Sequence, residues 1–199
     1  TNTDAVQVRE VKVENDRVYL YTVPYHADMR AMGGPLLEMY ISSPQPDIIR
    51  TEAYHFMGSN QKMPALELND AHCALEVENT ETTVTIKSGN TKLTSIGNRF
   101  GNAMISTIST PDGNYMRAQM NLDIGEKVYG LGERFTPYVK NGQTVETWNE
   151  DGGTCTEISY KSIPFYITNR NYGVLVNDPG PVSYEICSEH VTRVQFSVP

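Results

Sequence analysis

The sequence predicts an all-β protein, an antiparallel β-sandwich, from three observations. Apolar residues recur with a period of two along most of the chain, as at Val18 and Leu20, with Thr22 continuing the same side. Turn-forming residues separate these short runs at regular spacing, which is typical of sandwiches and barrels. No window longer than about two turns holds a convincing helical stripe, and the best place for a helical turn is 60–69.

The elements follow in chain order. A hairpin is predicted over 5–23, with its turn at Asn15-Asp16 and a slip in the alternation at Arg9-Glu10. The further strands are predicted at 36–42, 47–56, 73–78, 82–88, 91–96, 104–109, 115–121, 163–168, 172–177, 182–187 and 191–198. Turn chemistry between them is found at Ser88-Gly89-Asn90, Asn169-Arg170-Asn171 and Asp178-Pro179-Gly180-Pro181.

Two of the late strands are apolar almost throughout. The runs 163–167 and 174–176 do not alternate with polar residues. Such runs are typical of strands covered on both faces, and we expect part of that cover to come from polypeptide beyond Pro199. The sequence shows no internal repeat and no linker, so residues 1–199 are predicted to form a single N-terminal β-sandwich domain.

Composition narrows the function classes. The net charge of −8 and the absence of a basic block argue against a nucleic-acid partner. No apolar run approaches the roughly 20 residues of a membrane span, so no membrane partner is expected. Neutral ligands such as sugars are compatible with an acidic surface.

Cysteine usage favours a reducing compartment. Cys73, Cys155 and Cys187 are odd in number and none has CxxC spacing, so a disulfide framework is not predicted. There is no Asn-x-Ser/Thr sequon and no signal peptide at the N-terminus. We expect a cytoplasmic protein, with an already removed signal peptide left open.

The segment 128–154 is the strongest functional candidate. Its Gly, Pro and Asn residues break strand alternation, which predicts a long loop on a rigid β scaffold. Within it, 146–154 combines Trp148 with carboxylates. An indole can cover the apolar face of a sugar and carboxylates can accept hydrogen bonds from its hydroxyls. The alternative is that Asp-Gly-Gly is plain turn chemistry and Trp148 a core anchor.

Other sites fit this segment less well. Thr147, Asn149 and Asp151 match the first half of a calcium loop, but Ile158 stands where the bidentate Glu should be. Gly130 and Gly132 start a dinucleotide fingerprint that lacks its third glycine and its helix, so they are expected to allow a tight exit from a strand.

Autonomous catalysis has weak support in the sequence. A glycosidase pair could be drawn from Glu146, Glu150, Asp151 and Glu157, but clustering in one polar segment does not supply the required geometry. The dispersed histidines do not predict a zinc site, and no Gly-x-Ser-x-Gly elbow supports a catalytic triad. No cofactor is expected. Arg134 is predicted to be a structural hydrogen-bond anchor.

Several long motifs resemble one family. They are VYGLGERF at 128–135, NGQTVETWNEDGGT at 141–154, YKSIPFYITNRNYGVLVN at 160–177 and the closing VQFSV, with weaker similarity in 42–56 and 77–90. Together they resemble the N-terminal β-sandwich of glycoside hydrolase family 31, and most of all its α-xylosidase branch. The resemblance covers nearly the whole chain.

The resemblance implies a galactose-mutarotase-like super-sandwich that precedes a (β/α)₈ barrel in the same polypeptide. The barrel would carry both catalytic aspartates of a retaining mechanism, so no residue of this chain is expected to be catalytic. In the family, an N-terminal loop reaches the leaving-group sugar. The matching contact here would be Asp151, on a loop shaped by Trp148, Asn149 and Gly152.

The function expected from this resemblance is non-catalytic support of a retaining α-glycosidase, an α-xylosidase that hydrolyses terminal α-xylosides, with a loop contributed to the leaving-group sugar subsite. The partners would be the downstream barrel and an α-linked oligosaccharide, with a homo-oligomer left open. Two alternatives remain: a free-standing carbohydrate-binding module, and a mutarotase- or epimerase-like enzyme that uses the cleft of the sandwich itself.

Overall fold

The computed structural model describes residues 2–4, 7–23, 37–55, 71–81, 83–96, 105–154 and 156–199. These residues form antiparallel strands and contain no helix, which confirms the predicted all-β class. The helical turn expected at 60–69 lies outside them. None of the described segments forms an apolar helix of membrane-spanning length.

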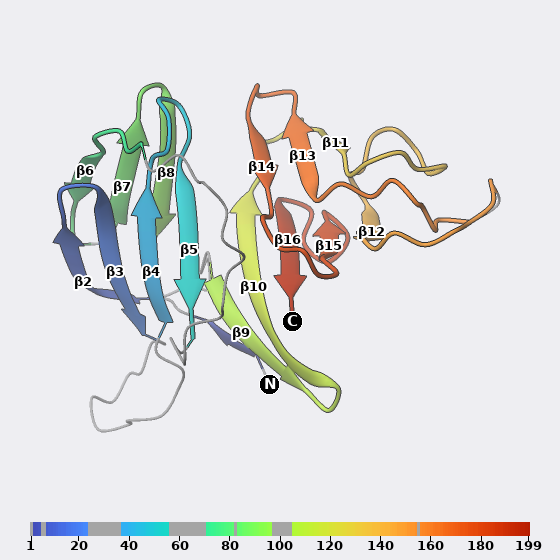
Figure 1. The fold of residues 1–199 in the computed structure, drawn as a ribbon, viewed down its shortest axis with the longest axis horizontal. Helices are drawn as coiled ribbons and strands as arrows, with labels where there is room; N and C mark the ends of the chain where they lie inside the picture. The colour runs from blue at the N-terminus through green and yellow to red at the C-terminus, as the bar shows by residue number, and fades with distance from the viewer. Residues whose placement is uncertain are drawn as a thin grey trace. The chain divides into compact units, whose positions relative to one another are not determined.

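The chain divides into two compact units, Thr1–Thr107 and Ile108–Pro199 (Figure 1). The strands of the first unit are β1 (Asn2–Asp4), β2 (Gln7–Val13), β3 (Arg17–Val23), β4 (Leu37–Ser42), β5 (Arg50–Tyr54), β6 (Glu76–Asn79), β7 (Thr83–Ser88) and β8 (Thr91–Ile96). β9 (Ile105–Thr110) crosses the boundary. The prediction that the whole chain is one domain stays a prediction.

The strands of the second unit are β10 (Gly113–Asn121), β11 (Val128–Gly130), β12 (Gln143–Glu146), β13 (Phe165–Thr168), β14 (Gly173–Leu175), β15 (Ser183–Ile186) and β16 (Arg193–Val198). Every strand predicted from the alternation has an observed counterpart. The predicted slip at Arg9-Glu10 is also confirmed, because the register of β2 against β3 shifts between Val8 and Glu10.

The first unit contains the sheets β2-β3-β4-β5 and β6-β7-β8. Val18, Leu20 and Thr22 are buried in alternation on β3, as the period of two requires, whereas Val84, Thr85 and Ile86 are buried in succession on β7. Hydrogen bonds tie the loop after β4 to the β7–β8 turn. Ser43 Oγ lies 2.6 Å from Ser88 Oγ, with both groups buried.

The second unit places β10-β16-β15-β12 and the sheet β11-β13-β14 around one core. Val128 and Tyr166 contribute from the three-stranded sheet, and Tyr184 and Val194 from the other. The rings of Tyr166 and Tyr184 meet edge to face with centroids 6.4 Å apart. This rigid core carries the segment that the sequence singles out.

The expectation that 128–154 contains no regular sheet is wrong at two places. β11 pairs with β13, and β12 pairs with β15 in a register that sets Val145 opposite Tyr184. Val145 is buried, and it is the one apolar residue in Gln143–Glu146. A four-residue strand with a single apolar position gives too little alternation to be recognised.

Candidate functional site

The chain leaves β11 through a tight turn that glycine makes possible. Gly130 and Gly132 have φ of +111° and +87°. A Cβ added at Gly132 would lie 2.0 Å from the carbonyl oxygen of Lys161. These glycines therefore serve close backbone packing, as predicted, and β12 is the next regular element after them.

Arg134 holds the base of the segment together. Its Nε donates to the Leu131 carbonyl at 3.0 Å, and its terminal nitrogens donate to the Glu146 carbonyl at 2.6 Å and the Glu157 carbonyl at 3.2 Å. A fourth bond, of 3.0 Å, reaches Ser162 Oγ. Arg134 thus joins four points far apart in sequence, which confirms its predicted role as a structural anchor.

The electrostatics of this anchor are those of a half-buried cation. Burial lowers the pKa of the Arg134 guanidinium, and the nearby Glu157 and Glu146 act in the opposite direction. An arginine stays charged under such shifts. The cation therefore orients the surrounding carbonyl dipoles, and it is already engaged by the loop itself.

The described residues 149–154 and 156–159 belong to an excursion whose two ends meet at one point. Asn149 and Ser159 form a parallel bridge, and the Glu150 amide donates to the Ser159 carbonyl at 3.0 Å. The tip turns where the amide of Thr156 donates to the Gly153 carbonyl at 3.1 Å.

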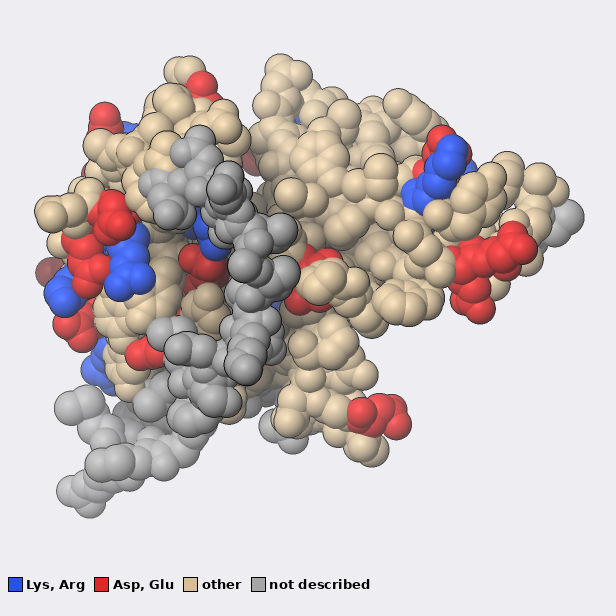
Figure 2. Space-filling view, in the orientation of Figure 1, with Lys and Arg blue, Asp and Glu red and all other residues tan. Residues whose placement is uncertain are grey.

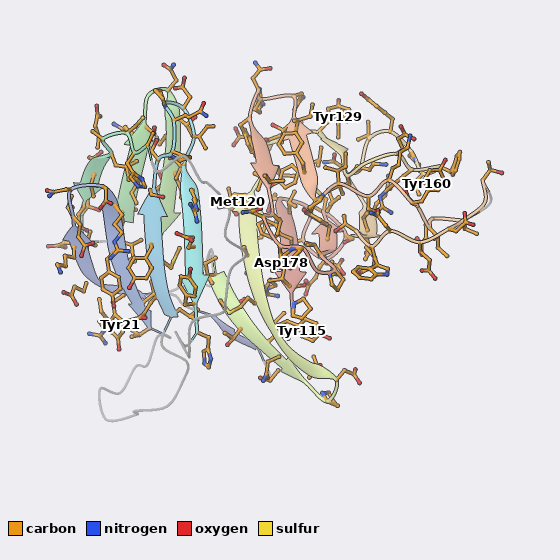
Figure 3. The ribbon with its side chains drawn as sticks, viewed as in Figure 1. Tyr21, Tyr115, Met120, Tyr129, Tyr160 and Asp178 are labelled. Carbon is orange, nitrogen blue, oxygen red and sulfur yellow. The ribbon has the colours of Figure 1, made fainter. Side chains whose placement is uncertain are left out.

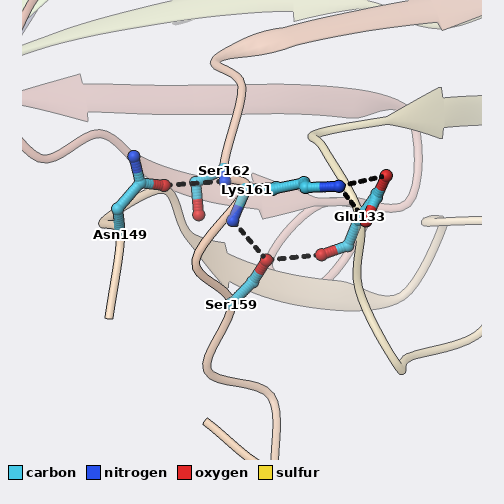
Figure 4. Close-up of polar contacts among 5 residues, drawn as sticks. All are labelled: Glu133, Asn149, Ser159, Lys161 and Ser162. Atoms are coloured by element: carbon cyan, nitrogen blue, oxygen red, sulfur yellow. Dashed lines mark hydrogen bonds and ion pairs between the residues drawn. The ribbon is translucent and has the colours of Figure 1, made fainter. Parts of the chain in front are cut away.

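Side-chain contacts fix the stems of this excursion (Figure 4). The amide of Ser162 donates to Asn149 Oδ1 at 2.8 Å. Ser159 Oγ donates to the Glu133 carbonyl, and Lys161 Nζ lies 3.1 Å from the Glu133 carboxylate. Asn149 is thereby a structural residue of the loop as well as a candidate binding residue.

The four predicted binding residues do not all meet at one place. Trp148 is 56% exposed, which argues against the core-anchor alternative. Asn149 and Asp151 are exposed, and among the described residues no hydrogen bond or ion pair to Asp151 is found. Gly152 packs against Ile158, since an added Cβ would lie 2.7 Å from the Ile158 Cβ. The binding roles of the four residues stay predictions.

A cavity of about 350 Å³ adjoins two of them. The residues that line it are Thr147, Trp148, Asn149, Ser162, Pro164, Asp178, Pro179 and Gly180. It therefore includes Trp148 and Asn149, whereas Asp151 and Gly152 lie outside it.

Asp178 is the site residue that sequence reasoning missed. The sequence marked 178–181 only as a stop between strands. The amide of Thr147 donates to the Val182 carbonyl at 2.9 Å, and this pairing brings the 178–180 turn beside Trp148. Asp178 Oδ1 accepts from the Gly180 amide at 2.7 Å, which fixes the carboxylate at the cavity wall. Recognising β12 and its pairing would have placed Asp178 beside Trp148, but the alternation in β12 is too short to be recognised from the sequence.

The chemistry available here is recognition of a neutral polar ligand. An exposed indole, a carboxylate and a carboxamide around one hollow suit a sugar ring with an apolar face and hydroxyl edges. Glu146 is engaged elsewhere, because its Oε1 accepts from Ser183 Oγ. Within the described residues, no cluster of three or more His, Cys, Asp or Glu side chains is arranged to hold a metal ion.

Comparison with known proteins agrees with this picture. The model of the glycosyl hydrolase 31 N-terminal galactose mutarotase-like domain matches residues 38–185. Alpha-xylosidase XylQ of Lactiplantibacillus pentosus is 40% identical over 174 residues, which cover 79% of this chain and 23% of XylQ. An alpha-xylosidase of Emericella nidulans is 62% identical over 84 residues, which cover 42% of this chain and 11% of that protein.

A solved structure gives the same fold. The cycloalternan-forming enzyme from Listeria monocytogenes, in complex with a pentasaccharide substrate, has a TM-score of 0.74 at 19% identity and covers 100% of this chain and 20% of that chain. The predicted galactose-mutarotase-like sandwich is confirmed. The chain spans less than a quarter of the length of these three relatives.

Proposed function

This chain belongs to glycoside hydrolase family 31, as an N-terminal galactose mutarotase-like domain, and from that premise we propose that it is the non-catalytic N-terminal domain of a retaining α-xylosidase. The observation that carries the specificity is the 40% identity to XylQ across 79% of the chain. The alpha-xylosidase of Emericella nidulans adds support, with 62% identity over 84 residues.

In this proposal the catalytic groups belong to a downstream (β/α)₈ barrel. The small share of each relative that the chain covers supports such a division of labour. Barrel active sites open at the C-terminal ends of the strands and are built from loops. A loop from a second domain can narrow that opening and contact the part of the substrate that leaves.

The excursion at 149–159 is suited to this role because its base is rigid. Arg134 and the Asn149–Ser159 bridge fix the stems, whereas Asp151 stands exposed near the tip. A group held in place before binding loses little conformational entropy when it contacts a ligand. We therefore assign Asp151 to the leaving-group sugar, with Trp148, Asn149 and Gly152 shaping its loop.

Replacing Asp151 tests the proposal in the full-length protein. Asp151→Ala should lower kcat/KM for an α-xylosyl disaccharide about tenfold, because a hydrogen bond from a sugar hydroxyl to a carboxylate contributes roughly 1.5 kcal/mol. An aryl α-xyloside lacks the leaving-group sugar, so its kcat/KM should change less than about twofold.

Asp112→Ala is the matched control, since Asp112 is an exposed carboxylate in the turn after β9. It should leave both substrates unaffected. Equal losses on both substrates for Asp151→Ala, or no loss on either, would contradict the role of the loop. Failure to hydrolyse any α-xyloside would contradict the proposed activity itself.

A carbohydrate-binding role is the second candidate, and the exposed Trp148 beside the cavity favours it. In that case xylose should bind the full-length protein even when a tight inhibitor occupies the active site. Calorimetric titration should then show heat that Trp148→Ala abolishes, because the indole supplies the stacking surface. Heat equal to that of buffer removes this candidate.

A further inference from the structure

The sheet β11-β13-β14 has an outer surface made of large apolar side chains. We define it as the apolar face: Tyr129, Tyr138, Phe165, Ile167 and Leu175. Phe165 lies opposite Leu175 and Ile167 opposite Tyr129, and residues opposite each other in a sheet project to the same side. The ring of Tyr138 packs on that of Tyr129 with centroids 5.3 Å apart.

Four of these side chains are exposed within the chain, and Tyr129 is half-buried. Tyr138 is 80% exposed, Leu175 60% and Ile167 46%. None of the five is charged, although the chain as a whole carries a net charge of −8. Figure 2 shows an almost uncharged surface over β13 and β14.

A glycine leaves room for one of the rings on this face. Gly173 lies opposite Ile167 on β14, and a Cβ there would lie 2.7 Å from the ring of Phe165. The absence of a side chain at Gly173 therefore lets the Phe165 ring lie over the backbone of β14. An aromatic and aliphatic surface of this kind suits packing against another layer of protein.

Both sides of β13 are consequently apolar, and only one side is covered. Tyr166 is fully buried on the inner side, between Phe165 and Ile167, which point outward. An antiparallel sheet with one solvent face normally alternates apolar and polar residues, whereas near-continuous apolar runs are typical of strands covered on both sides. The outer side of β13 thus has the composition of a covered surface, although its side chains are exposed in this chain.

The size of the face identifies the kind of partner. A stable contact between separate molecules buries about 800 Å² a side, from roughly 20–30 residues. Five side chains are too few for that. A segment of the same polypeptide needs much less area, because tethering gives it an effective concentration in the millimolar range.

The relatives supply such a segment. This chain is an N-terminal domain, and it covers 23% of XylQ. We propose that the apolar face is the docking surface for the polypeptide that follows residue 199, and that this segment presents aliphatic and aromatic side chains to it. The proposal rests on the proposed function as one domain of a longer glycosidase.

The apolar face is separate from the sugar-binding candidate. Tyr129 and Asp178, both labelled in Figure 3, come from different parts of the second unit. Neither Phe165 nor Leu175 lines the cavity beside Trp148. Occupation of the apolar face and contact with a sugar can therefore be tested independently.

Photo-crosslinking in the full-length protein tests the docking surface. We would replace Leu175 with p-benzoylphenylalanine, and in a matched control Ile124, which is 95% exposed in the same unit. Irradiation of the Leu175 variant should give a link within one chain to a peptide beyond residue 199. The Ile124 variant should give a yield of that link at least about fivefold lower, since its side chain lies in water.

Three other results would overturn the proposal. They are links from position 175 to peptides within 1–199, a crosslinked dimer on a denaturing gel, and a yield no higher than that of the Ile124 variant. If the Leu175 variant does not fold, thiol labelling of Leu175→Cys against Ile124→Cys answers the same question: at least tenfold slower labelling at position 175 supports docking, and equal rates overturn it.

Hydrolysis of an aryl α-xyloside by the same preparations separates this proposal from the proposed function. A link to the downstream segment in a protein without hydrolase activity would leave the docking surface standing and remove the α-xylosidase assignment. Activity without the link would do the reverse.

Discussion

Two aromatic sheet surfaces of this chain differ in whether their rings contact charged side chains. The outer surface of β3, β4 and β5 carries Tyr19, Tyr21, Tyr40 and Tyr54, which we call the tyrosine face. The apolar face of β11-β13-β14 carries three aromatic residues beside Ile167 and Leu175. On both sheets the opposite surface is packed into a core.

Charged side chains contact the rings of the tyrosine face. Tyr19 Oη donates to Glu38 at 3.1 Å, and Tyr54 Oη lies 3.4 Å from a Glu52 oxygen. The guanidinium of Arg17 lies 4.6 Å above the ring of Tyr40. Three of the four rings therefore lie beside a charged side chain.

The rings of the apolar face lack such partners. Its members pack on one another and on Gly173, and among the described residues no hydrogen bond to the hydroxyls of Tyr129 and Tyr138 is found. Aromatic content alone therefore does not distinguish a solvent surface from an interface. The polar partners of the rings make the distinction, because they indicate that the tyrosine face meets water and that the apolar face packs against protein.

The largest expected effect comes from placing the same cation on each surface of the full-length protein. Ile167→Lys should lower the free energy of unfolding by about 3 kcal/mol or more, because it leaves an unpaired charge under the docked segment. Tyr21→Lys should cost less than about 1 kcal/mol, since Tyr21 lies opposite Glu38 on a solvated surface.

Urea unfolding, followed at the transition of the N-terminal domain, measures both variants. Similar small losses would mean that Ile167 faces water in the full-length protein as well. In that case the distinction between the two surfaces would fail. Similar large losses would instead mean that the tyrosine face is also covered.

For each of these two surfaces, the sequence predicted which sides of a strand are covered. The alternation at Val18, Leu20 and Thr22 placed one side of β3 in the core, and the unbroken run 163–167 indicated cover on both sides of β13. What it could not give is the identity of neighbours across strands. The contact of Tyr19 with Glu38 depends on the register of β3 against β4, which alternation alone does not fix.

The candidate site shows the same limit more sharply. Trp148 and Asn149 were found because they stand in one motif, and Arg134 because its neighbours suggested an anchor. Asp178 was missed because it is 30 positions away from Trp148 in sequence and reaches the cavity only through the pairing of the chain around Thr147 and Val182. Local patterns find the members of one loop, and tertiary pairing adds those of another.

The second expected effect sharpens the comparison through pH. Burial, together with the hydrogen bond and charge of Glu38, raises the pKa of Tyr19 from its ordinary 10 to about 12. The unfolded chain ionises first as the pH rises, so the stability linked to Tyr19 is fully present below pH 10 and is lost between about 10 and about 12.

The substitution Tyr19→Phe removes this titration. The urea midpoint of the parent protein should fall more steeply than that of Tyr19→Phe between about pH 10 and about pH 12. Parallel slopes for the parent and Tyr19→Phe would show that the Tyr19 hydroxyl meets water rather than Glu38.

The smallest expected effect concerns the cation above the tyrosine face. Arg17 lies over Tyr40 and pairs with Glu14 at 2.7 Å, but it is exposed. Salt screens interactions between exposed charges, whereas it has little effect on apolar burial. Arg17→Gln should therefore lower the urea midpoint slightly at low ionic strength, and the difference from the parent should shrink as salt rises to about 0.5 M.

Leu175→Ala on the apolar face should show the opposite pattern, with a difference that persists at high salt because it reflects lost packing. A salt-independent Arg17→Gln difference would indicate that the tyrosine face is buried as well. The distinction between a solvent-exposed tyrosine face and an apolar face that packs against protein would then no longer hold.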